Sequence, residues 1–426
     1  MRGGMGRGER PLQPPPPTGH PSRHSNHVPL HPLSSVEVSR VRLLLCATIL
    51  AAQPAAAQQV PTRALKTPEA EFEQPFDAVF AIRELASGKV LVTDLGPKAV
   101  LLADLATGEQ VNVGRNGQGP GEYQFPGDLL PFRGDSVVLV DRVSRRLLVV
   151  SPEGKLGRTI PYPEGLSGMP DARGADRQGR IYFQGSPFRG ELGGGMEVGG
   201  ALPDSVALIR WDPATKRLDS LTRVKIPAIK MQVSGGQNAR TVMMRSQPFA
   251  PSDEWTVTPE GRVAIARVGD YHVEWLGAGA PVRGGPVPYD PLKVAAADKQ
   301  LFLEGMRTSR NRITITDGRG AGPAGGRNNQ DNGPPQMTEK DFDWPEVKPP
   351  FPTRALQFAP EGQLWVTRST SARDSTPVYD LFDAGGKLTG RVTLPLGRRM
   401  VGMGKGVVYA VRTDEDGLQW LERYRR

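Results

Sequence analysis

A short unit recurs along this chain and predicts its architecture. It consists of a turn residue, a five-residue strand, a polar stop residue and a second strand that ends near a glycine. The clearest copies are Gly88–Asp104 and Asp135–Ser151. In both, the stop residue lies six positions after the turn residue, and the second strand ends ten positions after the stop. Two matching offsets indicate a repeat of β-structure, not chance similarity.

Weaker copies extend the repeat over most of the chain. They begin at Gly179, Gly261, Gly362 and Gly406, and successive copies are separated by 47, 44, 82, 101 and 44 residues. The short spacings fit a four-stranded propeller blade of about 40–50 residues. The sequence therefore predicts an all-β fold, a six-bladed β-propeller, and a seventh blade within residues 262–361 remains an alternative. The innermost strands are expected at Val79–Arg83, Leu129–Phe132, Asp171–Gly174, Trp255–Thr258, Leu356–Ala359 and Met400–Met403.

The long spacings require insertions, and composition locates them at residues 190–203, 228–249 and 284–351. In the last of these, Asp290 precedes a proline suited to the first helical position, which predicts a helix from there to about Arg307. A short strand is expected at Ile313–Ile315. The segment after it, Asp317–Pro335, is rich in Gly, Asn and Arg and predicts a loop.

The last repeat ends at its third strand, Leu418–Tyr424, close to the end of the sequence. A four-stranded blade therefore needs an outer strand from elsewhere. We expect residues around Val60–Lys66 to supply it, because closing the ring in this way leaves no exposed sheet edge.

The N-terminal residues predict export. Residues 1–39 have almost no apolar periodicity and are expected to be disordered. Residues 40–57 contain basic residues, a short apolar run and Ala55-Ala56-Ala57, which is the order of a secretory signal peptide. Because a preamble of this length is unusual, we hypothesise that translation starts near Val38 or Val41. The propeller then occupies residues 58–426, in the periplasm or outside the cell.

The composition of the chain limits the kinds of molecule that it is expected to bind. Residues 58–426 keep 48 basic and 43 acidic side chains, a net charge of +5, against +9 for the whole chain. With no run of Lys and Arg, nucleic-acid binding is not expected. The apolar run before residue 57 is too short to span a membrane. The single cysteine, Cys46, lies in the signal peptide, so the exported part has no disulfide. We expect a monomer.

The blade pattern, together with the loop Gly114-Arg-Asn-Gly-Gln-Gly-Pro-Gly-Glu-Tyr-Gln-Phe-Pro126, resembles exported bacterial six-bladed propellers of the NHL-repeat type. The resemblance covers residues 75–160 well, where Asp141 and Ser151 match the usual strand-end positions, and the rest by pattern only. It implies a propeller fold and a binding role. The broad group includes protein-binding modules and sugar-lactone hydrolases.

No catalytic motif is present. The chain has neither G-x-S-x-G nor H-E-x-x-H, and His272 is the only histidine after residue 57. The glycine-rich loop at 114–121 is followed by a strand, not by the helix that a phosphate-binding loop needs. These motifs therefore predict no catalytic residue, no metal ligand and no cofactor.

The stop residues give the best candidate site. They are Asp94, Asp141, Gly185, Arg267, Arg368 and Arg412. The second strand of a blade ends beside the start of the innermost strand, so these residues are expected around one mouth of the central channel. Arginines there would bind a carboxylate or phosphate, and aspartates would bind hydroxyls or a cation. A purely structural role, with the aspartates capping turns, is the alternative.

Two functions remain open. The first is a non-enzymatic exported propeller that binds a small anionic or polar ligand, or a protein partner, on its loop face. The second is a metal-assisted hydrolase or lactonase with Asp94 and Asp141 as metal ligands. The second requires a further oxygen ligand that converges on the two aspartates.

Overall fold

The computed structural model describes residues 60–166, 168, 170–188, 202–228, 230–234, 241–245, 247–312 and 337–426. The chain divides into two units, residues 1–57 and 58–426, and every described residue belongs to the second. The predicted disordered segment and signal peptide, as well as the expected strand at 313–315 and the loop at 317–335, therefore lie outside the described residues. Within the described ranges, no helix has the length and apolarity needed to cross a bilayer.

Six sheets of four or five strands, besides two short two-stranded ones, form the described part of this unit, and in each of the six an inner, second, third and outer strand pair antiparallel in that order. The first sheet is β3 (Val79–Glu84), β4 (Val90–Asp94), β5 (Ala99–Ala103) and β6 (Gln110–Asn112). The second is β9 (Pro126–Pro131), β10 (Val137–Asp141), β11 (Arg146–Val150) and β12 (Leu156–Pro161). The third is β13 (Asp171–Ala175), β14 (Ile181–Gln184), β15 (Ser205–Asp212) and β16 (Arg217–Lys225).

The remaining three sheets follow the same order. The fourth is β19 (Glu254–Val257), β20 (Val263–Arg267), β21 (His272–Leu276) and β22 (Val282–Arg283). The fifth begins with β23 (Leu356–Phe358), β24 (Leu364–Thr367), β25 (Val378–Phe382) and β26 (Leu388–Thr393). The sixth is β27 (Arg398–Gly404), β28 (Val407–Thr413), β29 (Gln419–Arg425) and β2 (Ala70–Glu71).

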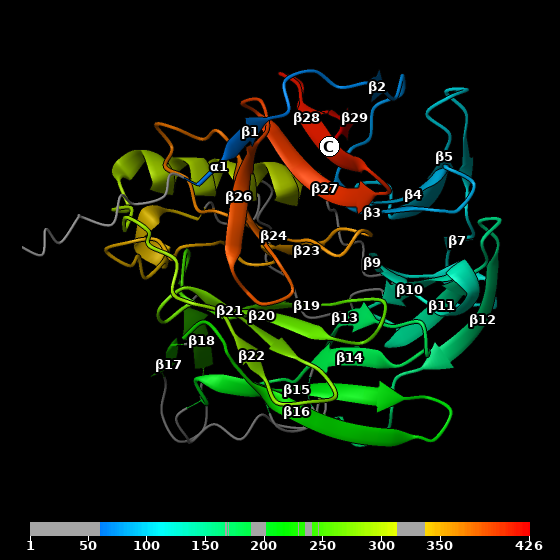
Figure 1. The fold of residues 1–426 in the computed structure, drawn as a ribbon, viewed down its shortest axis with the longest axis horizontal. Helices are drawn as coiled ribbons and strands as arrows, with labels where there is room; N and C mark the ends of the chain where they lie inside the picture. The colour runs from blue at the N-terminus through cyan, green and yellow to red at the C-terminus, as the bar shows by residue number, and fades with distance from the viewer. Residues whose placement is uncertain are drawn as a thin grey trace, which may run out of the picture. The chain divides into compact units, whose positions relative to one another are not determined.

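The sheets close into a ring. Each inner strand contacts the inner strand of the next sheet, and β27 contacts β3 (Figure 1). The fold is a six-bladed β-propeller, as the repeat predicted, and all six expected inner strands overlap β3, β9, β13, β19, β23 and β27. The described part of the long spacing between the fourth and fifth blades holds an insertion and no seventh sheet.

The turn residue of each repeat has a common backbone conformation. All six have φ between 59° and 97°, in the left-handed region. Glycine adopts this region without the penalty that a Cβ brings, which explains why five of the six are glycine. The sixth, Asp135, belongs to a residue type that tolerates it better than most. The spacing of glycines in the sequence therefore marks the turn between the inner and second strand of each blade.

The core lies between the blades. The buried apolar side chains of the described residues form six clusters, and each cluster draws its members from two adjacent blades. The second strands are covered on both faces; β4 and β10, for example, are buried at every position. A strand buried on both faces reads as a continuous apolar run, which is why these segments carried the repeat.

The ring closes through two N-terminal strands, not one. β1 (Thr62–Ala64) pairs in parallel with β26 and extends the fifth blade to five strands. β2 pairs antiparallel with β29 and completes the sixth blade. The expectation of closure by the N-terminal region is confirmed, but its assignment to residues 60–66 is wrong, because those residues join the neighbouring blade. Phe72 and Phe76, both fully buried, fix the segment after β2.

Two insertions have described structure. Residues 228–249 contain an antiparallel hairpin, β17 (Lys230–Ser234) with β18 (Thr241–Arg245). Residues 284–351 contain the helix α1 (Ala296–Arg312) and a short 3-10 helix, η2 (Glu339–Asp341). The predicted start of α1 at Asp290 is wrong by six residues, since Asp298 is the acid that accepts the backbone N–H of Ala295 at the helix start. Most of the predicted insertion at 190–203 lies outside the described residues.

Asp298 also ties α1 to the fifth blade. Its carboxylate accepts hydrogen bonds from Lys348 Nζ, at 2.9 Å, and from the backbone N–H of Ala372, at 2.7 Å. Burial alone would raise the pKa of Asp298, but Lys348 and the backbone donors hold it below its ordinary value. The ion pair lies within the insertion, and its two members join the insertion to the fifth blade: Asp298 through the N–H of Ala372, and Lys348 by donating to the carbonyl oxygen of Thr370.

The glycine-rich loop after the first blade has a structural role. β7 (Arg115–Asn116) and β8 (Glu122–Tyr123) pair in parallel within it. Arg146 donates to the carbonyl oxygens of Gly117, Gln118 and Glu122. A short 3-10 helix, η1 (Arg133–Asp135), forms the next turn. The loop is thus held by Arg146 of the second blade, into which it leads, as expected for a connection between blades.

Candidate functional site

The two predicted aspartates cap turns. Asp94, 3% exposed, accepts hydrogen bonds from the backbone N–H groups of Asp77, Ala78 and Gly96. Burial raises the pKa of Asp94, against the lowering effect of these donors. Asp141, fully buried, accepts from the backbone N–H groups of residues 124 and 125 and from Arg146 Nε at 3.1 Å.

The three predicted arginines each form ion pairs near their own strand. Arg267 pairs with Asp253 at 2.9 Å and with Glu274 at 2.8 Å. Arg368 pairs with the fully buried Asp380 at 2.9 Å. Arg412 contacts Glu71 at 2.8 Å and Glu422 at 3.4 Å.

These five residues do not form a shared pocket in the described structure. The strand geometry behind the prediction holds, since Asp94 pairs with Val79 at the start of β3 and Asp141 with Pro126 at the start of β9. However, no hydrogen bond or ion pair joins any two of the five, and none of them lines the central cavity described below. Arg368 instead borders a small cavity of about 170 Å³ beside the last insertion. Their role in ligand binding stays a prediction.

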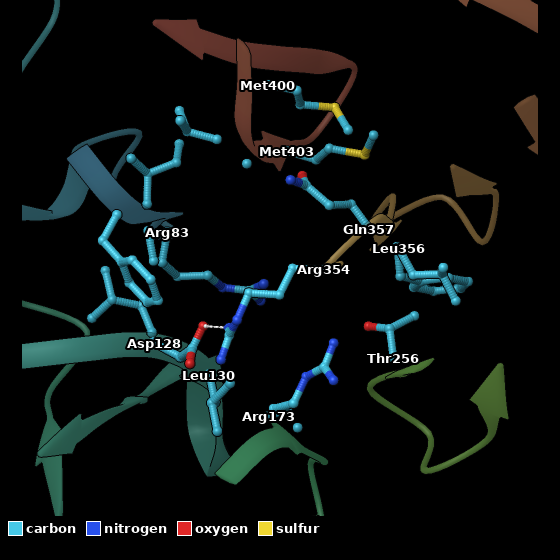
Figure 2. Close-up of a pocket in the computed structure, with 18 of the residues that line it drawn as sticks. Arg83, Asp128, Leu130, Arg173, Thr256, Arg354, Leu356, Gln357, Met400 and Met403 are labelled. Carbon is cyan, nitrogen blue, oxygen red and sulfur yellow. Dashed lines mark hydrogen bonds and ion pairs between the residues drawn. The ribbon is translucent and has the colours of Figure 1, made fainter. Parts of the chain in front are cut away.

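A cavity of about 720 Å³ lies at the centre of the ring, and residues from all six inner strands line it. This volume is in the range of small-molecule sites. Among the described residues that line it, Asp128 is the one acid, and five are arginines: Arg83, Arg173, Arg177, Arg354 and Arg399. Figure 2 shows the guanidinium groups of Arg83, Arg173 and Arg354 directed toward the middle of the cavity (Figure 2).

Four charged residues form a closed ring of ion pairs at this cavity. Arg354 contacts Asp128 at 2.8 Å and Asp171 at 2.9 Å. Arg142 contacts the same two carboxylates, at 2.8 and 3.1 Å. Since Arg354 comes from the fifth blade and the carboxylates from the second and third, its side chain crosses the channel. Figure 2 shows its bond to Asp128. The ring contains two positive and two negative charges.

The backbone of Arg354 is held in an unusual conformation. Its φ is +58°, in the left-handed region that non-glycine residues rarely adopt. Its N–H donates to Glu254 at 2.8 Å, which holds the residue in place. Burial alone would lower the pKa of Arg354, but Asp128 and Asp171 raise it above its ordinary value. Strained residues of this kind are concentrated at functional sites.

A second, fully enclosed ion pair lies beside this ring. Arg173 Nη2 contacts Glu254 at 2.5 Å, and the side chains are 10% and 4% exposed. The guanidinium carbon of Arg173 lies 5.2 Å from the ring centroid of Trp255. Gln184 accepts hydrogen bonds from both Arg173 and the indole N–H of Trp255. The charge of Arg173 is thus compensated within the protein.

Arg83 differs from the other arginines of the cavity. In the described part of the chain, no hydrogen bond or ion pair involves its guanidinium. Burial lowers the pKa of Arg83 from its ordinary value, yet an arginine stays charged at neutral pH. Arg399 is the nearest comparison, because its guanidinium also lacks a carboxylate partner but donates to the carbonyl oxygen of Val79 at 2.8 Å. The side chain of Arg83 is partly buried. Glu84 and Asp135 raise its pKa against the effect of burial, and Arg177 lowers it further. A partly buried guanidinium that makes no hydrogen bond can bind an anion.

The repeat could not have identified these arginines. Arg83 and Arg173 lie inside inner strands that the repeat located only by their distance to a turn residue, and Arg354 precedes its strand. The one usable signal was an arginine that follows four apolar residues in an inner strand, as in Val79–Glu84. A charged residue in a strand that packs at the centre of a ring must face the channel or be paired.

The metal-dependent alternative finds no converging ligands. Within the described ranges, no group of three or more His, Cys, Asp or Glu side chains is placed to hold a metal ion. Asp94 and Asp141 belong to different blades and accept backbone hydrogen bonds. His272, 3% exposed, lies between Asp270 and Glu274, with ring nitrogens 2.5 and 3.1 Å from their carboxylates, and sits at the start of β21 as the sequence indicated.

Fold and cavity together define a six-bladed β-propeller whose central channel is lined with basic side chains. Solved structures of similar fold include a protein of Bacteroides fragilis assigned as exported, with 12% identity over 86% of this chain and 99% of the other and a TM-score of 0.46. They also include a gluconolactonase of Xanthomonas campestris (11% identity, 83% and 91% covered, TM-score 0.40) and the virginiamycin B lyase of Staphylococcus aureus (8%, 84% and 98%, 0.39).

No functional conclusion follows from structures this dissimilar. No protein-family model matches the chain, and no curated protein matches it.

Proposed function

We propose that this protein is an exported, non-enzymatic propeller that binds a small anionic ligand in its central channel. The observation that carries the proposal is Arg83, a partly buried side chain that lines a cavity of about 720 Å³ and makes no hydrogen bond or ion pair among the described residues. Arg173, Arg177 and Arg354, which also line the cavity, each pair with a carboxylate. A bound anion would therefore compensate the charge of Arg83 in particular.

Replacing Arg83 by Met tests this proposal. In the unchanged protein, an anion at 100 times its dissociation constant stabilises the fold by about 2.7 kcal/mol, a rise of about 3 °C in Tm for a domain of this size. Arg83→Met should abolish that rise, and should itself raise the ligand-free Tm slightly because an unpaired charge is removed. Thermal unfolding of residues 58–426 against phosphate, succinate, gluconate and octanoate measures both effects.

Arg158→Met is the matched control, since it removes the same charge from an exposed position on β12. It should leave every anion-dependent shift unchanged. If no anion in the panel raises Tm, or if Arg83→Met leaves the shift intact, the channel is not an anion site.

The finer assignments from the sequence remain part of this proposal. We place the protein in the periplasm or outside the cell, in the NHL-like group, as a monomer that does not bind nucleic acid. A protein partner on the loop face is compatible with the same fold.

The export assignment predicts that the secreted protein begins at or near Gln58. Intact-mass measurement of the exported material checks this, and retention of residues 1–57 would contradict it.

A further inference from the structure

Ion pairs balance the charge of three of the five arginines that line the central cavity. Arg354 belongs to the neutral ring that it forms with Arg142 and two aspartates. Arg173 pairs with Glu254 at 2.5 Å. The third, Arg177, lies 3.5 Å from an exposed glutamate. The net charge of the cavity therefore depends on the two remaining arginines.

These two, Arg83 and Arg399, leave an excess of two positive charges at the cavity. Neither forms an ion pair in the part of the chain that the structure describes. Burial lowers the pKa of Arg399, and no described carboxylate opposes that effect. Both guanidiniums nevertheless stay charged at neutral pH, because the pKa of arginine is far above 7.

The two acids that act on Arg83 do so without contact. Glu84 accepts the hydroxyl hydrogen of Tyr409 at 2.6 Å and the backbone N–H of Lys405 at 3.3 Å. Asp135 is exposed, in the turn η1. Neither belongs to the lining of the cavity. The N–H donors of the Arg83 guanidinium are therefore available to an anion inside the cavity.

Arg83 and Arg399 line the cavity from neighbouring inner strands, β3 and β27. Figure 2 shows the guanidinium of Arg83 directed toward the middle of the cavity. Arg399 is an exposed residue, and its one hydrogen bond among the described residues goes to the carbonyl oxygen of Val79. A guanidinium has five N–H donors, so the other donors of Arg399 are available as well.

Polar groups supply much of the surface that a ligand in this cavity would touch. The Thr256 hydroxyl and the Gln357 amide border the cavity, and neither makes a hydrogen bond in the described structure. The apolar side chains of the lining are largely covered, as for Leu130 and Val257, which are 6% and 7% exposed. A wall of this kind favours a ligand that carries hydroxyl, carbonyl or amide groups.

We propose that the channel binds a polar dianion, whose two negative charges are compensated by Arg83 and Arg399. This rests on the proposed anion-binding function and names the charge and polarity of the anion. A monoanion would leave one of the two guanidiniums uncompensated. Carboxylate and phosphoryl oxygens both suit a guanidinium, so the test has one arm for each acid group.

Isothermal titration of residues 58–426 at constant ionic strength compares two pairs of ligands that differ by one charge. Succinate is compared with succinamate, in which an amide replaces one carboxylate. Glucose 6-phosphate is compared with glucose 6-sulfate at pH 8, where the phosphate ester is a dianion and the sulfate ester a monoanion of similar shape. In at least one pair the dianion should bind at least about tenfold more tightly, as expected for additional charge-assisted hydrogen bonds. The pair that shows this preference identifies the acid group.

Arg399→Met tests the source of the second charge. It should weaken the preferred dianion at least about tenfold and leave the matching monoanion unchanged, because the monoanion depends on Arg83. Arg399→Lys keeps the positive charge and should keep the preference for the dianion. Arg158→Met, which removes a charge from an exposed position on β12, should keep it too.

The outcomes separate this proposal from the proposed function. If neither dianion is preferred, or if the preference survives in Arg399→Met, the dianion class is wrong, and anion binding that Arg83→Met abolishes leaves the proposed function in place. If no ligand loses affinity in Arg83→Met, the proposed function fails as well. Should Arg399→Met bind neither member of a pair, Arg399→Lys decides, since a loss of the preference there overturns the dianion class.

Discussion

Replacing Glu254 by Gln is expected to lower the free energy of unfolding by about 3 kcal/mol, because it leaves a buried guanidinium without its counter-charge. Glu254 is 4% exposed and Arg173, its partner at 2.5 Å, is 10% exposed. The same carboxylate accepts the N–H of Arg354, so the variant also weakens the contact that holds Arg354 at positive φ. Urea denaturation with linear extrapolation measures the loss.

The chain offers a matched control in Glu260→Gln. Glu260 pairs with Arg177 at 3.5 Å, but the two side chains are 63% and 67% exposed. An exposed pair contributes little, so this variant should change the unfolding free energy by less than about 0.5 kcal/mol. Equal losses in the two variants would show that the enclosed pair at the channel has no special weight in stability.

The second large effect is expected at Asp380, the buried acid of the fifth blade. Its carboxylate contacts Arg368 at 2.9 Å and Arg391 at 2.8 Å, and accepts the hydroxyl hydrogen of Tyr271 at 2.7 Å. Asp380→Asn keeps the shape of the side chain but removes the negative charge that pairs with Arg368 and Arg391. We expect a loss of about 3–4 kcal/mol in the free energy of unfolding, as for other buried ion pairs broken on one side.

Asp416→Asn provides the comparison for Asp380, since Asp416 is an exposed residue in the turn between β28 and β29. It should be neutral within about 0.5 kcal/mol. If Asp380→Asn is as stable as the unchanged protein, the pairing of Asp380 with Arg368 and Arg391 contributes nothing to stability and the expected loss is wrong.

The blade architecture was predictable because each blade depends on residues that are close together in the sequence. A turn that needs positive φ selects glycine, and a strand covered on both faces selects a continuous apolar run, so Gly88 with Val90–Asp94 marks a blade without knowledge of the rest. The extra strand β1 and the start of α1 were missed. Both depend on partners that are distant in the sequence: β26 for the strand, and Lys348 and Ala372 for Asp298.

The site was less predictable for a related reason. Asp94 and Arg412 were placed correctly along their strands, but the direction of a side chain and its partners depend on the neighbouring segments. The ring of ion pairs joins Arg354 to Asp128, 226 positions earlier in the sequence. No repeat unit contains both residues, and only closure of the ring brings them into contact.

The two N-terminal strands also bear on when this protein can fold. A chain that leaves the ribosome N-terminus first presents Thr62–Glu71 long before β26 and β29, the strands on which β1 and β2 pair. The fifth blade can take up β1 once Thr393 has emerged, but the sixth blade is incomplete, and the ring open, until Arg425 has emerged. Pairing between such distant segments is intrinsically slow. The position of β2 and β29 therefore couples completion of the ring to arrival of its last strand.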